Sequence, residues 1–199
     1  MISIIDYGMG NVASVQKALN FLNLESIVTA DFGQIDKSEY IILPGVGSFL
    51  QAMRNLKSKG LDVFLNEQVI GKKKKFLGIC LGMQLLAETG TEPYNNPGLG
   101  WIKGTVNKIE GIPLRIPHMG WNNINVKIDQ YFVNIPTSDF YFIHSYHLVP
   151  DDKSIIAATV DYGMEVVASI QQDNIFATQF HPEKSQGAGL SVLKTFFNA

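Results

Sequence analysis

Short apolar runs alternate with amphipathic segments over roughly the first ninety residues. Runs of this kind, rich in isoleucine and leucine and ended by turn residues, are typical of buried strands. Strands are expected at residues 2–5, 26–29, 40–43 and 76–79. Apolar positions between them recur at helical spacing, and helices are expected over 12–22, from about 48, and over 61–70. This alternation predicts a parallel, doubly wound α/β sheet.

The second half of the chain has a different pattern. A loop rich in glycine, proline and asparagine at residues 91–100 precedes short strand-like segments with frequent breakers. We expect these strands at residues 101–102, 106–109, 124–128, 141–143, 155–159, 166–170 and 175–179. Several should pair antiparallel as a small appendage on the main sheet, and residues 190–197 should form a closing helix. No linker is visible, so a single domain over residues 1–199 is predicted.

Composition narrows the class of protein. The 199 residues are 46% hydrophobic and 17% charged, which is typical of a globular protein and not of a disordered one. A net charge of −2 gives no electrostatic footprint for nucleic acid. One cysteine excludes an intrachain disulfide and a cysteine-rich zinc site. No signal peptide or apolar run of roughly 20 residues is present, so we expect a cytoplasmic protein with no membrane partner.

The only cysteine lies in the turn after one predicted strand, in the sequence GICLG at residues 78–82. Ligands of doubly wound sheets bind outside the carboxyl ends of the strands, where this turn should open. Glycines on both sides of Cys80 let a strand reverse sharply into a helix, as in the nucleophile elbow. The helix N-terminus would favour a thiolate and face a developing oxyanion. The alternative is a small buried core residue, the usual role of a lone cysteine.

A second candidate group follows the last predicted strand. His181, Pro182 and Glu183 come directly after the β-rich run that ends at residue 180. Glu183 can turn back through the proline bend to hold one imidazole nitrogen, and the other nitrogen would then face the sulfur. This is the nucleophile, base and orienter arrangement of a hydrolytic triad. Without Cys80, a histidine before a proline would be read as a plain surface turn residue.

The paired motifs resemble those of the triad, or class I, glutamine amidotransferases. The resemblance implies a flavodoxin-like fold: a mixed, mainly parallel central sheet flanked by helices. It implies Cys80 as nucleophile, His181 as general base and acid, and Glu183 as the residue that orients His181. The reaction would release ammonia from glutamine and then hydrolyse a glutamyl thioester, with no metal and no cofactor. The residues implied at the oxyanion and glutamine sites are Gly45, Val46, Gly47, Leu81, Gln84, His144, Ser145 and Tyr146.

Finer motifs are similar to one branch of that family, the glutaminase subunits of imidazole glycerol phosphate synthase. They are DYGMGN at 6–11, PGVG at 44–47, GICLGMQLL at 78–86, PHMGWN at 117–122, YFIHSY at 141–146 and QFHPEKS at 179–185. The branch implies a heterodimer with a (β/α)8-barrel synthase subunit of histidine biosynthesis, which would receive ammonia and make imidazole glycerol phosphate and AICAR. Many class I members carry Pro-Gly-Gly where this chain has Val46, and in this branch that side chain accompanies an oxyanion strand that is unready until the partner is engaged. The residues implied near the partner-facing surface are Tyr7, Asn11, Pro117, His118, Met119, Gly120, Trp121 and Asn122.

Three alternatives stay open at this point. A paralogous subunit that supplies ammonia for amidination of a bacterial surface sugar would carry the same catalytic motifs. A non-catalytic regulatory or scaffold subunit would keep the fold and the interface alone. A free-standing cysteine hydrolase of the same fold would turn over without a partner.

Overall fold

One long sheet runs through the molecule and is parallel over its first half. In the computed structural model, which describes residues 1–198, nine strands of that range form the sheet in the order β2-β1-β3-β4-β13-β12-β11-β8-β9. The parallel part consists of β2 (Ser26–Thr29), β1 (Ile2–Ile5), β3 (Tyr40–Gly45), β4 (Lys75–Cys80) and β13 (Ile175–Thr178). The parallel sheet predicted for the N-terminal half is confirmed.

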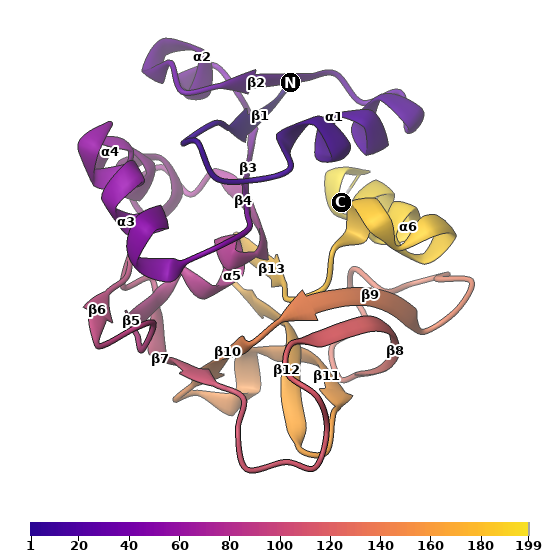
Figure 1. Ribbon diagram of the computed structural model, residues 1–199. Helices are drawn as coiled ribbons and strands as arrows, with labels where there is room; N and C mark the ends of the chain where they lie inside the picture. Colours follow the sequence, from indigo (N-terminus) through magenta and orange to yellow (C-terminus); the bar gives the residue numbers. More distant parts are fainter. Residues whose placement is uncertain (199) are drawn as a thin grey trace.

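The remaining strands of this sheet are antiparallel. They are β12 (Glu165–Gln172), β11 (Ile156–Asp161), β8 (His118–Val126) and β9 (Asp139–His144). A smaller sheet in the described residues has the order β10-β7-β5-β6, formed by β10 (Tyr146–Pro150), β7 (Ile102–Lys108), β5 (Ala87–Gly90) and β6 (Asn96–Pro97). The antiparallel strands therefore continue the main sheet, and the smaller sheet lies beside it (Figure 1).

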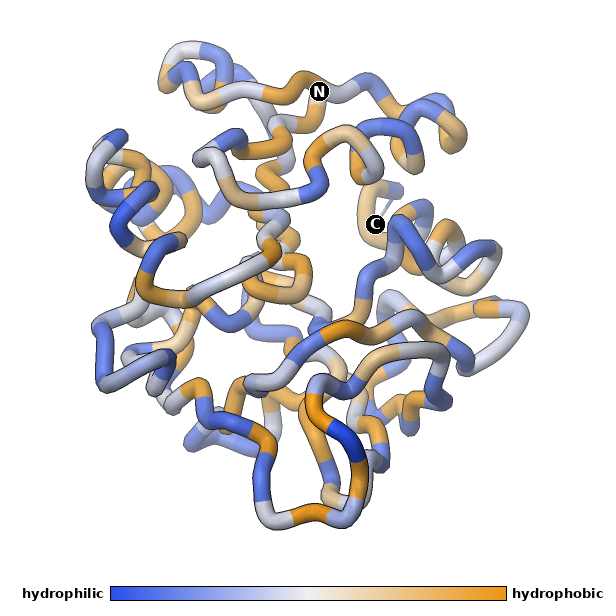
Figure 2. The backbone as a smooth tube through the Cα atoms, in the orientation of Figure 1, coloured by the Kyte–Doolittle hydropathy of each residue, from blue (hydrophilic) through white to orange (hydrophobic). Residues whose placement is uncertain are grey.

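Helices cover both faces of the parallel part, as Figure 1 shows. On one side are α1 (Val12–Phe21) and α6 (Gln186–Asn198), and on the other are α3 (Phe49–Ser58), α4 (Leu61–Asn66) and the π-helical turn η1 (Glu67–Gly71). Consecutive residues of β3 alternate between the two resulting cores: Ile41 and Leu43 pack with the α3 side and Ile42 with the α1 side. Figure 2 shows the hydrophobic segments gathered along these central strands. Burial from both faces explains the continuous apolar runs of the strands.

Short helical turns complete the chain. They are α2 (Phe32–Asp36), α5 (Leu81–Gln84) and the two 3-10 turns η2 (Lys153–Ile155) and η3 (Pro182–Lys184). Asn11 and Asp31 cap α1 and α2, because their side-chain oxygens accept the backbone N–H groups of Ser14 and Gln34. The turns α5 and η3 follow the neighbouring strands β4 and β13, so they bring both candidate catalytic motifs to one sheet edge.

Several predicted boundaries were wrong. The helical spacing after Cys80 gives only the four-residue α5, and the chain then enters β5. Strand β10 was not predicted, and β8 begins at His118, six residues before the predicted start at 124. β8 is long but mostly polar and exposed, and β10 has only five residues, so neither has a clear strand pattern of its own and pairing with neighbouring strands decides their structure.

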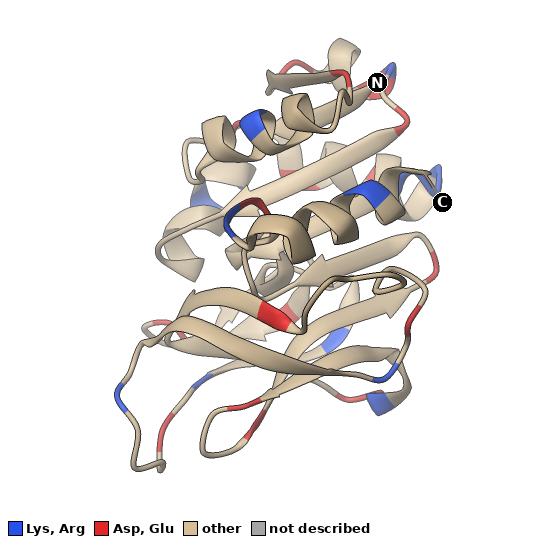
Figure 3. Ribbon diagram, turned by 90° about the vertical axis from the view of Figure 1, so that its right-hand side faces the viewer, with Lys and Arg blue, Asp and Glu red and all other residues tan. Residues whose placement is uncertain are grey.

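Charge and hydropathy agree with a globular α/β domain. On the side shown in Figure 3, lysine, arginine, aspartate and glutamate are spread over both layers without a face of one sign. Within residues 1–198, no helix combines the length and the apolar character needed to cross a bilayer.

Candidate active site

Cys80 lies at a strained bend between β4 and α5. Its backbone has φ 54° and ψ −108°, in the positive-φ region that residues other than glycine rarely adopt. A Cβ on Gly78 would lie 2.9 Å from the carbonyl oxygen of Gly82, and a Cβ on Gly82 would lie 1.8 Å from that of Leu43. The predicted strand–turn–helix bend is confirmed, and its tight contacts explain both glycines. Strain of this kind is concentrated at functional sites.

The close contact at Gly82 makes a direct prediction. Gly82→Ala would force its new Cβ into the Leu43 carbonyl, a rigid backbone atom of β3, so we expect a loss of about 3 kcal/mol in the free energy of unfolding. The matched control is Gly71→Ala, where the nearest atom to a Cβ is the flexible Glu67 side chain at 4.0 Å. Urea unfolding of both variants measures the difference. Equal stabilities would mean that the elbow is not closely packed.

His181 and Glu183 form a buried pair at the same sheet edge. Paired residues Ile79 of β4 and Thr178 of β13 end side by side, so the residues that follow them meet. The Nδ1 atom of His181 lies 2.8 Å from Oε1 of Glu183, and the two side chains are 2% and 1% exposed. Because a carboxylate only accepts, Nδ1 carries the proton and Nε2 is turned toward other partners.

The electrostatics of His181 indicate a pair with the sulfur. Burial lowers the pKa of His181, but interactions with Cys80 and then with Glu183 outweigh burial and raise that pKa to about 10. No atom of residues 1–198 meets the geometry of a formed hydrogen bond with His181 Nε2. The Cys80 thiol thus lies within interaction range of the imidazole, and Nε2 has no competing partner. A thiolate–imidazolium pair is the arrangement that activates a cysteine nucleophile.

Two further groups contact the sulfur. Gln179 donates from Nε2 to Cys80 Sγ over 3.6 Å, and the Sγ lies 3.8 Å from the carbonyl oxygen of Ile143. Cys80 is buried but still lines a cavity of about 420 Å³. The structure brings most of the residues expected at the glutamine and oxyanion sites to this cavity: Val46, Gly47, Leu81, Gln84, His144, Ser145 and Tyr146.

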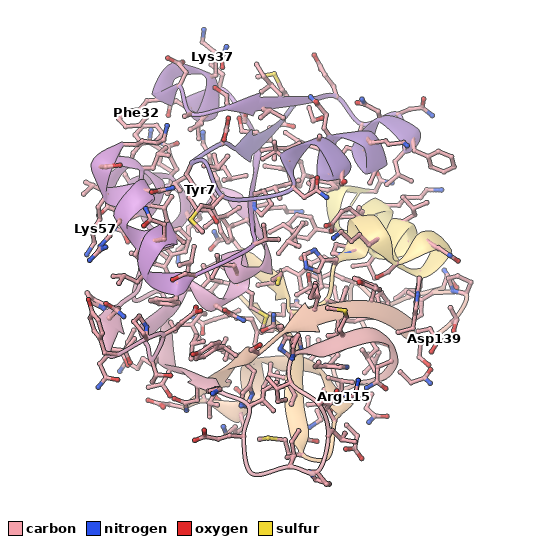
Figure 4. All side chains as sticks on the ribbon, in the orientation of Figure 1. Tyr7, Phe32, Lys37, Lys57, Arg115 and Asp139 are labelled. Carbon is pink, nitrogen blue, oxygen red and sulfur yellow. The ribbon has the colours of Figure 1, made fainter. Side chains whose placement is uncertain are left out.

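Gly45 lies at the end of β3 beside the elbow. It pairs with Cys80 in the sheet, and a Cβ on it would lie 2.9 Å from the Leu81 Cβ and 2.5 Å from the Tyr7 hydroxyl. Tyr7, one of the residues expected near the partner-facing surface, is buried, and its side chain points into the protein (Figure 4). Its hydroxyl has no hydrogen-bond partner among residues 1–198, and burial and the charge of Cys80 raise the pKa of Tyr7. The hydroxyl therefore stays protonated behind the turn that follows β3.

The other residues expected at the partner surface differ in their exposure. On β8 and just before it, Pro117, Met119 and Trp121 are exposed, whereas Gly120 and Asn122 are half-buried. Half-buried Asn11 caps α1. His118, like Tyr7, is buried, because strand alternation turns it inward between its exposed neighbours.

Sequence reasoning missed four lining residues and one contact. Ser48, Glu92, Ile143 and Lys184 also line the cavity, and Gln179 contacts the sulfur. Lys184 and Gln179 belong to the QFHPEKS motif, so the motif itself was the signal that could have identified them. Glu92 lies in the glycine- and proline-rich loop, where no pattern marks it. No group of three or more potential metal ligands occurs within the described part of the chain.

Comparisons with known proteins identify the family of this chain. The family model "Glutamine amidotransferase class-I" matches residues 3–199. The chain is 47% identical to "Imidazole glycerol phosphate synthase subunit HisH 1" of Campylobacter jejuni subsp. jejuni serotype O:23/36 (strain 81-176), covering 98% of each chain. It is 48% identical to the subunit HisH of Geobacter sulfurreducens, covering 98% of this chain and 97% of the relative.

Solved structures show the same fold at low sequence identity. A structure titled "Crystal structure of glutamine amidotransferase" aligns with a TM-score of 0.76 at 17% identity, over 98% of both chains. A chain of the PurLQS structure from Thermotoga maritima aligns with a TM-score of 0.75 at 19% identity, over 99% of this chain and 97% of that one. By sequence and by fold, this chain belongs to the class I glutamine amidotransferases, in the branch of the glutaminase subunits of imidazole glycerol phosphate synthase.

Proposed function

We propose that Cys80, His181 and Glu183 carry out the glutamine hydrolysis of this subunit, and that the ammonia passes to a (β/α)8-barrel synthase subunit. The single observation that supports these roles best is the buried His181–Glu183 pair beside the strained Cys80 elbow, with the imidazole charged by its neighbours. A cysteine that only packs in the core would need neither a positive φ nor the neighbouring His181–Glu183 pair.

In this proposal the thiolate of Cys80 attacks the carboxamide carbon of glutamine and forms a tetrahedral intermediate. Backbone N–H groups of the turn after β3 and of Leu81 stabilise its oxyanion. The His181 imidazolium gives its proton to the departing nitrogen, which leaves as ammonia, and a glutamyl thioester remains on Cys80. His181 then takes a proton from water, which attacks the thioester and releases glutamate. Glu183 keeps the ring oriented throughout and stabilises its charge in the imidazolium form.

The cavity has the groups that glutamine requires. A free amino acid carries an ammonium and a carboxylate, and Glu92 and Lys184 supply the complementary charges in the cavity lining. Glu92 is held in place because its carboxylate accepts the Phe49 backbone N–H over 2.9 Å. Gln84 uses its amide nitrogen in bonds to Tyr146 and Gln179, so its carbonyl oxygen is the atom that would receive the substrate amide.

The partner surface proposed here is the face of β8 next to the cavity. Met119 is 59% and Trp121 49% exposed, which is a large apolar area for an isolated surface strand. The relatives are named as subunits of imidazole glycerol phosphate synthase, and this favours histidine biosynthesis over the surface-sugar alternative. Glutamine and the phosphorylated acceptor are intracellular metabolites, so a cytoplasmic location is part of the proposal.

The test is ammonia transfer in the assembled complex. The chain is combined with the barrel subunit and the ribulosyl acceptor, and glutamine labelled with ¹⁵N in its amide is supplied together with unlabelled ammonium at a concentration that gives little product without glutamine. We expect ¹⁵N in imidazole glycerol phosphate and slow glutamate release by the chain alone, since Val46 sits in the oxyanion turn. Label lost to bulk ammonium, or full glutaminase activity without the barrel, would contradict the channelled, partner-dependent reaction.

A further inference from the structure

The carbonyl oxygen of Tyr146 is a shared hydrogen-bond acceptor between β8 and the nucleophile. It lies 2.9 Å from Nδ1 of His144 and 2.9 Å from Nε2 of Gln84. A carbonyl can only accept, so both nitrogens must donate, and this fixes the tautomer of His144 and the orientation of the Gln84 amide. These two bonds determine which atoms donate and which accept in the hydrogen bonds that continue from His144 to β8 and from Gln84 to the sulfur.

The outer arm runs through two buried histidines. Because His144 donates from Nδ1, its Nε2 is an acceptor, and it receives the Nδ1–H of His118 over 3.0 Å. The Nε2 of His118 in turn accepts from the Asn122 amide over 3.3 Å. His118 and His144 are directly opposite each other in the β8–β9 ladder, and Asn122 is one residue beyond the exposed Trp121.

The inner arm reaches the nucleophile. Gln84 donates from the same Nε2 to Oε1 of Gln179 over 3.0 Å, and Gln179 donates from Nε2 to Cys80 Sγ over 3.6 Å. Donor and acceptor directions agree at every step, so one connected set of bonds extends from Asn122 to the sulfur. The Gln84 and Gln179 amides have one arrangement that satisfies these bonds.

The surroundings keep the two histidines neutral and fixed. The His118 ring stacks on Tyr162 at 3.9 Å and on Phe142 at 4.7 Å between ring centres. Burial lowers the pKa of His118 to about 4 and the pKa of His144 to about 3. Both rings therefore keep one donor and one acceptor at neutral pH, which is the state that the bonds on either side require.

We propose that His118 and His144 are positioning residues for Cys80: they hold the Tyr146 carbonyl, which orients Gln84 and thereby the Gln179 N–H that is donated to the sulfur. This role rests on the proposed action of Cys80 as nucleophile. In this scheme the orientation of the Gln179 N–H at the sulfur depends on Asn122. Asn122 is half-buried on β8, the strand that carries the proposed partner surface. Neither histidine contacts the reacting atoms in this scheme.

The test uses His118→Phe, which keeps a ring to stack on Tyr162 but leaves His144 Nε2 without a donor. His118→Asn is the conservative variant, because its amide can place a donor where Nδ1 lies. The matched control is His147→Phe, a buried histidine of β10 whose Nδ1 has no partner within residues 1–198. The readouts are the rate constant for alkylation of Cys80 by iodoacetamide, which reports one site because the chain has one cysteine, and kcat and KM for glutamate release in the complex.

We expect His118→Phe to slow alkylation and to lower kcat by about tenfold each, the size of one hydrogen bond to a charged group, with KM within about twofold of wild type. His118→Asn should recover most of both losses, and His147→Phe should remain within about twofold of wild type. Equal values for His118→Phe and wild type, or equal losses in the His118→Phe and His147→Phe variants, would overturn the positioning role. If His118→Phe does not fold, His118→Leu replaces it as the variant without a donor: a tenfold loss that His118→Asn recovers supports the role, and wild-type rates in His118→Leu contradict it. A wild-type complex that releases no glutamate would instead refute the proposed function.

Discussion

Cys80→Ala in the assembled complex is expected to reduce the kcat for glutamate release on the order of 10⁴-fold or more, because the covalent route disappears with the sulfur. The remaining hydrogen-bond donors and the cavity would still bind glutamine, so KM should change little. The variant removes a buried but small side chain at the edge of a cavity, and the fold should tolerate the change. Steady-state glutamate release with the partner and acceptor present is the measurement.

The proposed barrel subunit supplies an internal control for this variant. Free ammonium at high concentration bypasses the glutaminase site, so the Cys80→Ala complex should make product from ammonium at the wild-type rate. Loss of both reactions would indicate a misassembled complex. Retention of glutamine-dependent turnover in Cys80→Ala would show that another residue is the nucleophile.

His181→Gln is expected to lower kcat by roughly 10³-fold, since the group that charges the sulfur, protonates the leaving ammonia and activates water is lost. Glu183→Gln provides a graded comparison, because its amide oxygen can still accept the His181 Nδ1–H but carries no charge. Removing the Glu183 contribution lowers the pKa of His181, so the imidazolium is lost at a lower pH than in wild type. The pH dependence of kcat in the complex, with wild type, Glu183→Gln and His181→Gln side by side, measures both effects.

Two results would contradict the roles expected of His181 and Glu183. If His181→Gln kept a kcat within tenfold of wild type, the imidazole would be an orienting group and not the base. If Glu183→Gln left the pH profile of kcat unchanged, the 2.8 Å bond between His181 and Glu183 would have no part in charging the ring.

The parallel half of the fold could be predicted from sequence because both faces of its strands are buried. Strands β1, β3 and β4 are continuous apolar runs, and the helices between them have helical periodicity, so local pattern and burial agree. The first predicted helix, over residues 12–22, is confirmed as α1 to within one residue. The antiparallel half gives weaker signals, since β8 alternates exposed residues with buried ones such as His118 and Ile124.

The candidate catalytic motifs could be predicted because their backbone turns require particular residues. The tight turns at Cys80 and His181 require glycine or proline at neighbouring positions. Such residues can be recognised in a sequence. The hydrogen bonds that the Tyr146 carbonyl accepts from His144 and Gln84 cannot be recognised in the sequence. They depend on which way a carbonyl points in the one-residue connection at Ser145 between β9 and β10, and only coordinates contain that information.

The positions of Tyr7 and His118 show the limit of motif reasoning most clearly. Both residues belong to motifs that the sequence associates with the partner surface, yet both side chains point inward. A motif marks a segment, and the alternation of side chains along a strand or turn decides which of its residues are exposed. Met119 and Trp121 are exposed apolar side chains of β8, while His118 belongs to the buried hydrogen bonds around Tyr146.

The most direct measurement of the central claim is covalent trapping of Cys80. The wild-type complex is incubated with a chloromethyl ketone analogue of glutamine, and the intact mass and the peptide map of this chain are recorded. The account expects one adduct per chain, on the peptide that contains Cys80, formed far more slowly in His181→Gln and prevented by excess glutamine. An adduct on a different residue, or no difference between wild type and His181→Gln, would contradict a thiolate charged by His181 at the glutamine site.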